Sequence, residues 1–158
     1  MRESYLSAGA RLSYTQAGAG LPVVFLHPTP LDHDYWRPLV AELDDIQAFL
    51  PDFRGHGGSE LGSLAEGGFS RVPNAPVLTM TRLALDVQAL LDALGIKEAV
   101  FAGCSVGGYQ HRDLREQSLL CVTYLLCGVA LTRPQRTQCV SCSQLFATLT
   151  HTADLHTL

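Results

Sequence analysis

Short apolar runs alternate with polar, glycine-rich segments along the N-terminal two-thirds of the chain. The run Leu21–Leu26 and the run at residues 99–102 are continuously apolar, which is typical of strands buried on both faces of a parallel sheet. A shorter run at residues 48–51 predicts another strand. Residues 4–6 and 11–15 flank an Ala-Gly-Ala turn and predict a short antiparallel hairpin.

Helical periodicity is clearest after residue 79. Leucine and valine recur there at spacings of three and four residues, at Leu83, Val87, Leu90, Leu91 and Leu94. Gly95 follows the last of them, where a left-handed C-terminal cap belongs. The pattern predicts an amphipathic helix from about Thr79 to Gly95.

A second helix is expected after the strand Leu21–Leu26. Asp34 is predicted to cap it, and Pro38 is tolerated in its first turn. Its apolar face has helical spacing and consists of Trp36, Leu39, Val40 and Leu43.

Strand, helix, strand, helix is the order of an α/β protein with a partial doubly wound, mostly parallel sheet and flanking helices. Residues 61–77 are rich in Gly, Ser and Pro and predict a surface loop, and the Leu/Val/Cys-rich run at 119–131 predicts a sixth strand. Residues 1–135 are interpreted as the N-terminal part of one domain. Residues 136–158 form an unassigned tail, expected to fray or to be disordered.

Composition narrows the class of protein. The 158 residues suffice for one domain, and 11 basic against 15 acidic residues give a net charge of −4 without a basic run, which argues against nucleic acid as a partner. Membrane-length apolar stretches and a signal-peptide core are lacking in the sequence, and the odd number of cysteines, 5, does not suggest a disulfide framework. A cytoplasmic protein with reduced thiols and no membrane partner is expected.

The candidate chemistry lies directly after the strand at 99–102. Residues 103–107 read Gly-Cys-Ser-Val-Gly and fit G-x-S-x-G, a turn that lifts a serine above the sheet edge and into the mouth of the next helix. The glycines have a steric reason, because the strained turn brings the positions two before and two after the serine too close for side chains. Ser105 is therefore the candidate nucleophile.

A serine nucleophile attacking a carbonyl needs two backbone N–H donors for the oxyanion. Val106, at the start of the following helix, would supply one. The loop His27-Pro28-Thr29-Pro30 would supply the other; only His27 and Thr29 have an N–H there, and Thr29 is the better placed.

Together these segments resemble the α/β-hydrolase fold superfamily. The matching motifs are residues 27–30 at an HG-x-P-like loop, residues 52–59 at a D-x-R-G-x-G-x-S turn, and residues 103–107. The resemblance implies Ser105 as nucleophile, Val106 and Thr29 as oxyanion donors, and a mainly structural role for 52–59. It also implies a small-molecule acyl substrate (a carboxylic ester, a lactone or a relative) and no cofactor or metal.

The chain departs from the family after about residue 110. The family order is serine, then acid, then histidine, and residue 158 comes too soon after Ser105 for the usual acid, histidine and last strands. The sequence is therefore interpreted as truncated or altered, with near-background ester hydrolysis and an open sheet edge near residues 122–131 that favours self-association. The alternative is a catalytically silent hydrolase-like fragment or binding protein.

His27, His56 and Cys104 receive structural interpretations. Both histidines lie on loops near the expected site, but the family uses neither as its base. Cys104 cannot replace Ser105, because residue 102 is Ala rather than the Gly that a shifted motif requires, so it is interpreted as a packed thiol.

Two alternatives for the tail remain open. Asp154 with His151 or His156 has the residue types to rebuild a triad. Cys139 and Cys142 followed by the same two histidines give a weak zinc-like pattern, since zinc fingers separate their ligand pairs further.

Overall fold

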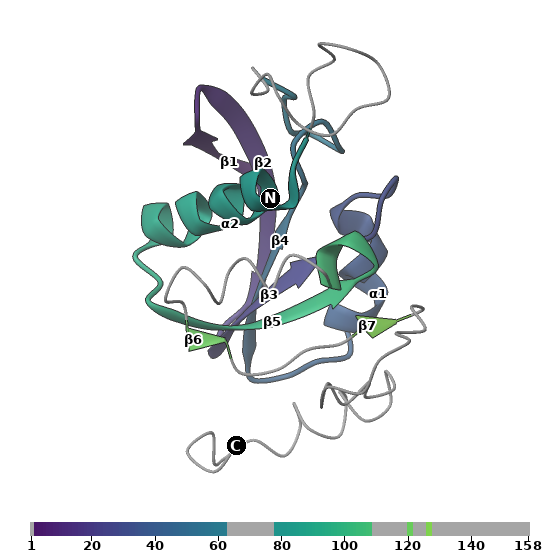
Figure 1. Ribbon diagram of the computed structural model, residues 1–158. Coiled ribbons are helices and arrows are strands. Elements are labelled where there is room, and N and C mark those ends of the chain that lie inside the picture. The colour runs from purple at the N-terminus through teal and green to yellow at the C-terminus, as the bar shows by residue number, and fades with distance from the viewer. Residues whose placement is uncertain (1, 63–77, 109–119, 122–125, 128–158) are drawn as a thin grey trace, which may run out of the picture.

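A computed structural model describes residues 2–62, 78–108, 120–121 and 126–127 of the chain. Their strands form one sheet in the order β1-β2-β4-β3-β5-β6, and β7 also pairs with β5 (Figure 1). The strands are β1 (Arg2–Ser7), β2 (Ala10–Gly18), β3 (Leu21–Leu26), β4 (Ile46–Pro51), β5 (Glu98–Cys104), β6 (Leu120–Cys121) and β7 (Leu126–Cys127).

The sheet is mixed, as predicted. β1 and β2 form the expected hairpin, longer than the sequence suggested, with Ser7 opposite Ala10 and left-handed backbone at Ala8 and Gly9. β2 pairs with β4 in antiparallel fashion, whereas β3 runs parallel to both β4 and β5. The α/β class with a mostly parallel central sheet is confirmed.

Helix α2 (Met80–Leu94) confirms the strongest helical prediction. The Thr79 hydroxyl accepts a hydrogen bond from the Arg82 N–H at 3.1 Å, and Gly95 ends the helix in the left-handed conformation with a φ of 68°. The five predicted apolar residues of this helix face the sheet: four are buried, and Leu94 packs against the same cluster.

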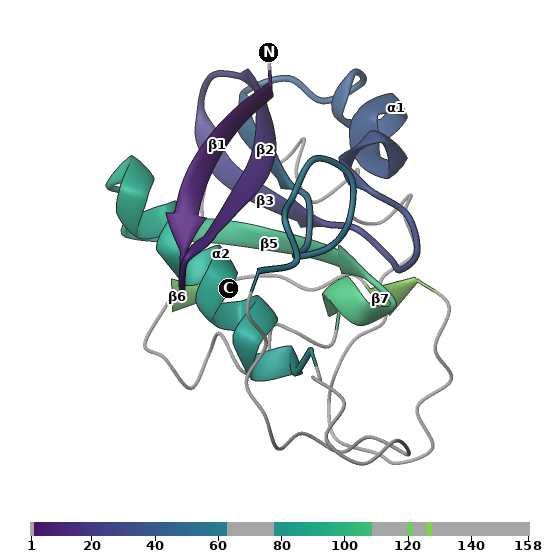
Figure 2. The same ribbon diagram turned by 90° about the horizontal axis from the view of Figure 1, so that it is seen from above.

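Side chains alternate across β3 and fill two apolar layers. Val24 and Leu26 belong to the cluster under α2, whereas Val23 and Phe25 join Trp36 on the other face. The helices α1 (Arg37–Val40) and α2 accordingly lie on opposite faces of the sheet (Figures 1 and 2). The continuous apolar pattern of Leu21–Leu26 reflects this burial on both faces.

The helix expected after β3 is shorter than predicted and capped by a different residue. A 3-10 turn, η1 (His33–Trp36), leads into α1 (Arg37–Val40). Asp32, not Asp34, is the cap: Asp32 is extended, and its carboxylate accepts the Asp34 N–H at 3.0 Å, so Asp34 already lies inside the turn.

The helix ends early, yet its apolar positions keep their partners. Leu39, Val40 and Leu43 still pack against the cluster around Trp36. The chain then turns at Asp45, whose φ is 59° and whose carbonyl oxygen accepts the Leu21 N–H at 3.0 Å. This bond joins the start of β3 to the segment that enters β4.

Several predictions fall wholly or partly outside the described residues. Most of the 61–77 loop, the tail at 136–158 and the domain boundary at 135 lie there. Of the predicted sixth strand at 119–131, the described parts are β6 and β7, both parallel to β5. Among the helices that are described, none has the length and apolar character needed to cross a bilayer.

Candidate active site

Ser105 lies at the turn between β5 and a helical segment that begins at Val106. Its φ is 53°, in the left-handed region that non-glycine residues seldom adopt. The Ser105 carbonyl oxygen accepts the Gly108 N–H at 2.9 Å, which closes the first helical turn. The strained serine expected from the sequence is therefore present.

Both glycines of the motif are required by their surroundings. A Cβ on Gly103 would run into the carbonyl oxygen of Gly107, which is the close approach that the sequence predicted. A Cβ on Gly107 would instead run into the carbonyl oxygen of Leu26. The turn of residues 103–107, called the elbow below, thus packs closely against the end of β3 as well as against itself.

The two predicted oxyanion donors, Thr29 and Val106, follow the ends of two neighbouring strands. Leu26 of β3 is opposite Gly103 of β5, so Thr29 and Val106 both follow at the same edge of the parallel sheet. Thr29 is exposed and lies in a turn that the Leu31 N–H closes on the Pro28 carbonyl oxygen at 3.0 Å. Neither the Thr29 nor the Val106 N–H donates a hydrogen bond to another described residue.

His27 is fully buried, and both of its ring nitrogens are used. Its Nε2 accepts the Phe53 N–H at 2.9 Å, so Nδ1 carries the proton and donates to the Pro28 carbonyl oxygen at 3.0 Å. Burial lowers the pKa of His27 below its ordinary 6.5. This histidine holds the loop and has no free nitrogen for proton transfer.

His56 and Cys104 also occupy structural positions. The His56 ring lies 5.4 Å from the His27 ring between centroids, and its Nδ1 is 3.1 Å from the Arg54 carbonyl oxygen. Cys104 is a buried free thiol, and its Sγ accepts a hydrogen bond from the Tyr35 hydroxyl at 3.5 Å. The interpretation of Cys104 as a packed thiol is confirmed.

The turn at residues 52–59 is organised around the buried carboxylate of Asp52. Its Oδ2 accepts the Gly58 N–H at 2.9 Å, and the Ser59 hydroxyl donates to the Asp52 carbonyl oxygen at 2.7 Å. A Cβ on Gly57, whose φ is 51°, would collide with the carboxyl group. The identity of each of these motif residues is therefore explained by a hydrogen bond or by a lack of space for a side chain.

The structure adds a partner that the sequence analysis missed. Oδ1 of Asp52 accepts both the His33 N–H at 2.9 Å and the His33 Nδ1–H at 2.7 Å. Burial alone would raise the pKa of Asp52, but the N–H groups of Gly58 and His33 and the His33 ring outweigh it, so the pKa is lowered. These residues are 19 apart in sequence and carry no periodic signal that predicts their pairing.

Arg54, in the same turn, is completely buried against helix α2. Its Nε and Nη2 donate to the two carboxylate oxygens of Asp86 at 2.9 and 2.7 Å, and Nη2 also donates to the Ser7 carbonyl oxygen at 3.0 Å. The Ser7 hydroxyl donates to Asp86 at 2.7 Å. Arg54 thus connects the turn, β1 and α2.

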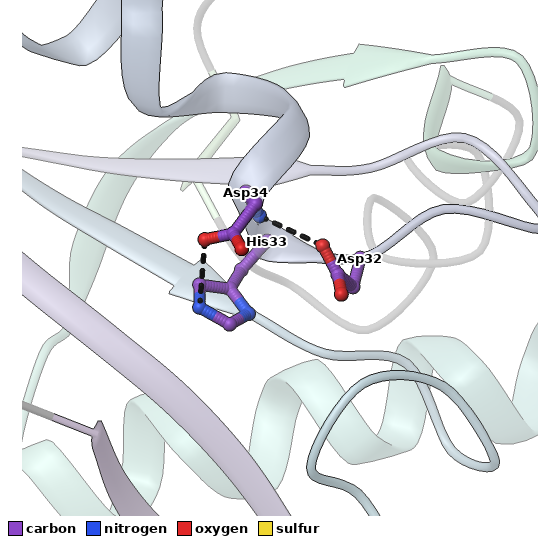
Figure 3. Close-up of side chains that lie close together, drawn as sticks. All are labelled: Asp32, His33 and Asp34. Carbon is purple, nitrogen blue, oxygen red and sulfur yellow. Dashed lines mark hydrogen bonds and ion pairs between the residues drawn. The ribbon is translucent and has the colours of Figure 1, made fainter.

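Asp32, His33 and Asp34 bring three possible metal-ligand atoms within 4.8 Å of one another (Figure 3). Their polar atoms already have other partners, however. Asp32 caps the 3-10 turn, His33 Nδ1 is bound to Asp52, and Asp34 pairs with Arg37 at 2.7 Å. The positive charge of the Arg37 guanidinium disfavours a metal cation beside it. We therefore interpret these three residues as a capped turn with an ion pair.

The alternatives for the tail lie outside the described residues. They concern Cys139, Cys142, His151, Asp154 and His156, the candidates for a rebuilt triad or a zinc site. Both ideas stay predictions.

Comparison with known proteins identifies the family. The profile described as the alpha/beta hydrolase family matches residues 23–151, most of the chain. The sheet order, the strained serine after β5 and this match agree: the chain belongs to the alpha/beta hydrolase family.

The relatives act on several kinds of substrate. A soluble epoxide hydrolase of Corynebacterium sp. (strain C12) is 32% identical over 69% of this chain and 37% of its own. A 3-oxoadipate enol-lactonase of Acinetobacter baylyi is 36% identical over 54% of this chain and 28% of its own. A thermophilic esterase of Thermogutta terrifontis superposes with a TM-score of 0.63 and 29% identity over 80% of this chain and 44% of its own. The chain thus spans less than half the length of these proteins.

Proposed function

We propose that this chain carries the nucleophile and the oxyanion donors of a serine hydrolase acting on a carboxylic ester, a lactone or a related acyl substrate. The observation that supports it most is Ser105, held at a φ of 53° between a buried strand and the start of a helix. Such a backbone is costly for a serine, and it presents the hydroxyl at the edge of the sheet.

In the proposed reaction, the Ser105 oxygen attacks the carbonyl carbon of the substrate while the hydroxyl proton passes to a base. The N–H groups of Val106 and Thr29 receive the negative charge that develops on the carbonyl oxygen. Collapse of the intermediate expels the alcohol, which takes up a proton, and water then releases the acyl group from Ser105. The described histidines His27 and His33 hold structural hydrogen bonds, so neither is assigned as the base.

An acyl substrate fits this arrangement better than an epoxide, although one relative is an epoxide hydrolase. Two N–H donors beside a serine suit the oxygen of a planar carbonyl that becomes tetrahedral. The enol-lactonase and the esterase among the relatives support the same class of substrate.

A fluorophosphonate probe tests the nucleophile. The probe forms a bond between the serine oxygen and phosphorus with loss of fluoride, and an activated Ser105 should be labelled at one site. Ser105→Ala should abolish the labelling, whereas Ser4→Ala, a change at an exposed serine of β1, should leave it intact. Equal labelling of wild type and Ser105→Ala would refute the assignment. A wild type that is never labelled would favour the alternative, a catalytically silent hydrolase-like protein.

A further inference from the structure

The loop that carries Thr29 is tied at both ends to two consecutive residues of another segment. At its start, His27 Nε2 accepts the N–H of Phe53 at 2.9 Å. At its end, the His33 N–H and Nδ1–H both reach Oδ1 of Asp52, at 2.9 and 2.7 Å. The loop of residues 27–33 is therefore clamped onto the end of β4, one strand further from Ser105 than β3.

The two ends of this clamp differ in strength. The bond at His27 joins a neutral ring to one backbone N–H. The bond at His33 is made by a buried carboxylate that accepts two hydrogens from one residue, and bonds to charged groups are about twice as strong as neutral ones. Asp52 is itself fixed on its other oxygen by the Gly58 N–H at 2.9 Å.

Within the described part of the chain, the middle of the loop makes few hydrogen bonds of its own. Thr29 is exposed, and the turn around it is closed by the bond from the Leu31 N–H to the Pro28 carbonyl oxygen. The position of the Thr29 N–H therefore depends on where the two ends of the loop are held. An oxyanion donor must be placed to within about half an ångström to be effective.

We propose that Asp52 and His33 are positioning residues, which hold the loop of residues 27–33 so that the Thr29 N–H points at the oxyanion site beside Ser105. The proposal rests on the proposed function for its catalytic part. It assigns to this pair the placement of a donor that neither residue touches.

Two measurements test it on the full chain. Amide hydrogen exchange reports whether the loop is held. Fluorophosphonate labelling at Ser105 reports whether the Thr29 donor is in place. The labelling rate is measured against probe concentration, which gives a maximal rate and a half-saturating concentration. Asp52→Asn removes the carboxylate charge, and His33→Leu removes the ring donor while it keeps the backbone N–H bond. Asp44→Asn, at an exposed aspartate, is the matched control.

We expect Asp52→Asn and His33→Leu to increase exchange at Leu31 and His33 while β3, β5 and α2 keep their protection. The maximal labelling rate should fall about 10- to 100-fold, because a misplacement of about 1 Å can cost about 100-fold and the complete loss of a donor costs more. The half-saturating concentration should change less than about twofold. His33→Asn, whose side-chain amide can donate to Asp52, should recover part of the rate.

The outcomes separate this proposal from the proposed function. Faster exchange in the loop with an unchanged maximal labelling rate would overturn the positioning role, and so would unchanged exchange in both variants. If the wild type shows no Ser105-dependent labelling, the proposed function fails, and hydrogen exchange alone decides whether the pair holds the loop. If Asp52→Asn does not fold, His33→Leu carries the same tests.

Discussion

Arg54 and Asp86 form a two-point ion pair in the interior of the protein, with N–O distances of 2.9 and 2.7 Å and an arginine that is inaccessible to solvent. The partners come from segments 32 residues apart, the turn after β4 and the helix α2. Asp86 has a second basic partner, Arg82, at 3.0 Å, so removal of Arg54 still leaves it paired. Removal of Asp86 instead leaves the Arg54 guanidinium buried without an acidic partner.

Asp86→Leu should therefore lower the free energy of unfolding by about 3–5 kcal/mol. The double variant Arg54→Met/Asp86→Leu should lose less free energy of unfolding than this single variant, because it removes both buried charges of the pair. Chemical denaturation measures both, with Asp92→Asn at an exposed position of α2 as control. A double variant less stable than Asp86→Leu would contradict the prediction.

Gly107→Val tests the contact between the elbow and β3. A side chain at this position meets the carbonyl oxygen of Leu26, so either the elbow or the end of the strand must shift. We expect a loss of about 1–3 kcal/mol in the free energy of unfolding.

Thermal denaturation measures this effect, and the melting temperature of Gly107→Val should be lower than that of the wild type. Gly9→Asn serves as control, because Gly9 is also a turn glycine but has open space around it, and asparagine tolerates a left-handed backbone. An unchanged melting temperature for Gly107→Val would mean that the elbow is not pressed against Leu26.

The backbone of Ser105 can be tested apart from its chemistry. Ser105→Gly and Ser105→Ala both lack the hydroxyl and should both prevent labelling, but only glycine adopts a φ of 53° at little cost. The left-handed conformation costs other residues about 1–2 kcal/mol, partly offset by the greater freedom of glycine in the unfolded chain. Ser105→Gly should thus be more stable than Ser105→Ala by about 0.5–1 kcal/mol. Equal stability would argue against a strained elbow.

Burial of His27 predicts a pH dependence of stability. Because its pKa is lowered in the folded state, the unfolded chain binds the proton more readily. The contribution of His27 is therefore present at neutral pH and is lost as the pH falls through the unfolded value, near 6.5.

His27→Gln removes the titrating group, while its amide oxygen can still accept the Phe53 N–H. The variant should lose less stability than the wild type between pH 7.5 and 5.5, measured by denaturation at each pH. Parallel curves for the two proteins would contradict the assignment of a neutral, hydrogen-bonded His27.

Local pattern was sufficient for much of the fold. Thr79 and Gly95 bound α2 as predicted, since capping depends on the residues within one turn of the helix end. The same local reasoning chose Asp34 as a cap, and it was wrong, because three nearby positions offer polar side chains and only backbone geometry distinguishes Asp32 among them.

The elbow glycines were also foreseen, but the partner of Gly107 on β3 was not. The pair of Asp52 and His33 and the pair of Arg54 and Asp86 were both missed. Such contacts join segments that only the completed sheet brings together, so they leave no trace in local spacing. The roles of Ser105, Val106 and Thr29 stay predictions until labelling tests them.

The contacts of Asp86 have a kinetic consequence. The hairpin of β1 and β2 closes over a two-residue turn and can form early, whereas the bond from Ser7 to Asp86 spans 79 residues and needs α2 already docked. Contacts formed after the transition state slow unfolding without speeding folding. We therefore expect Asp86 to slow unfolding rather than to speed folding. Its loss should shorten the lifetime of the folded protein far more than it delays refolding.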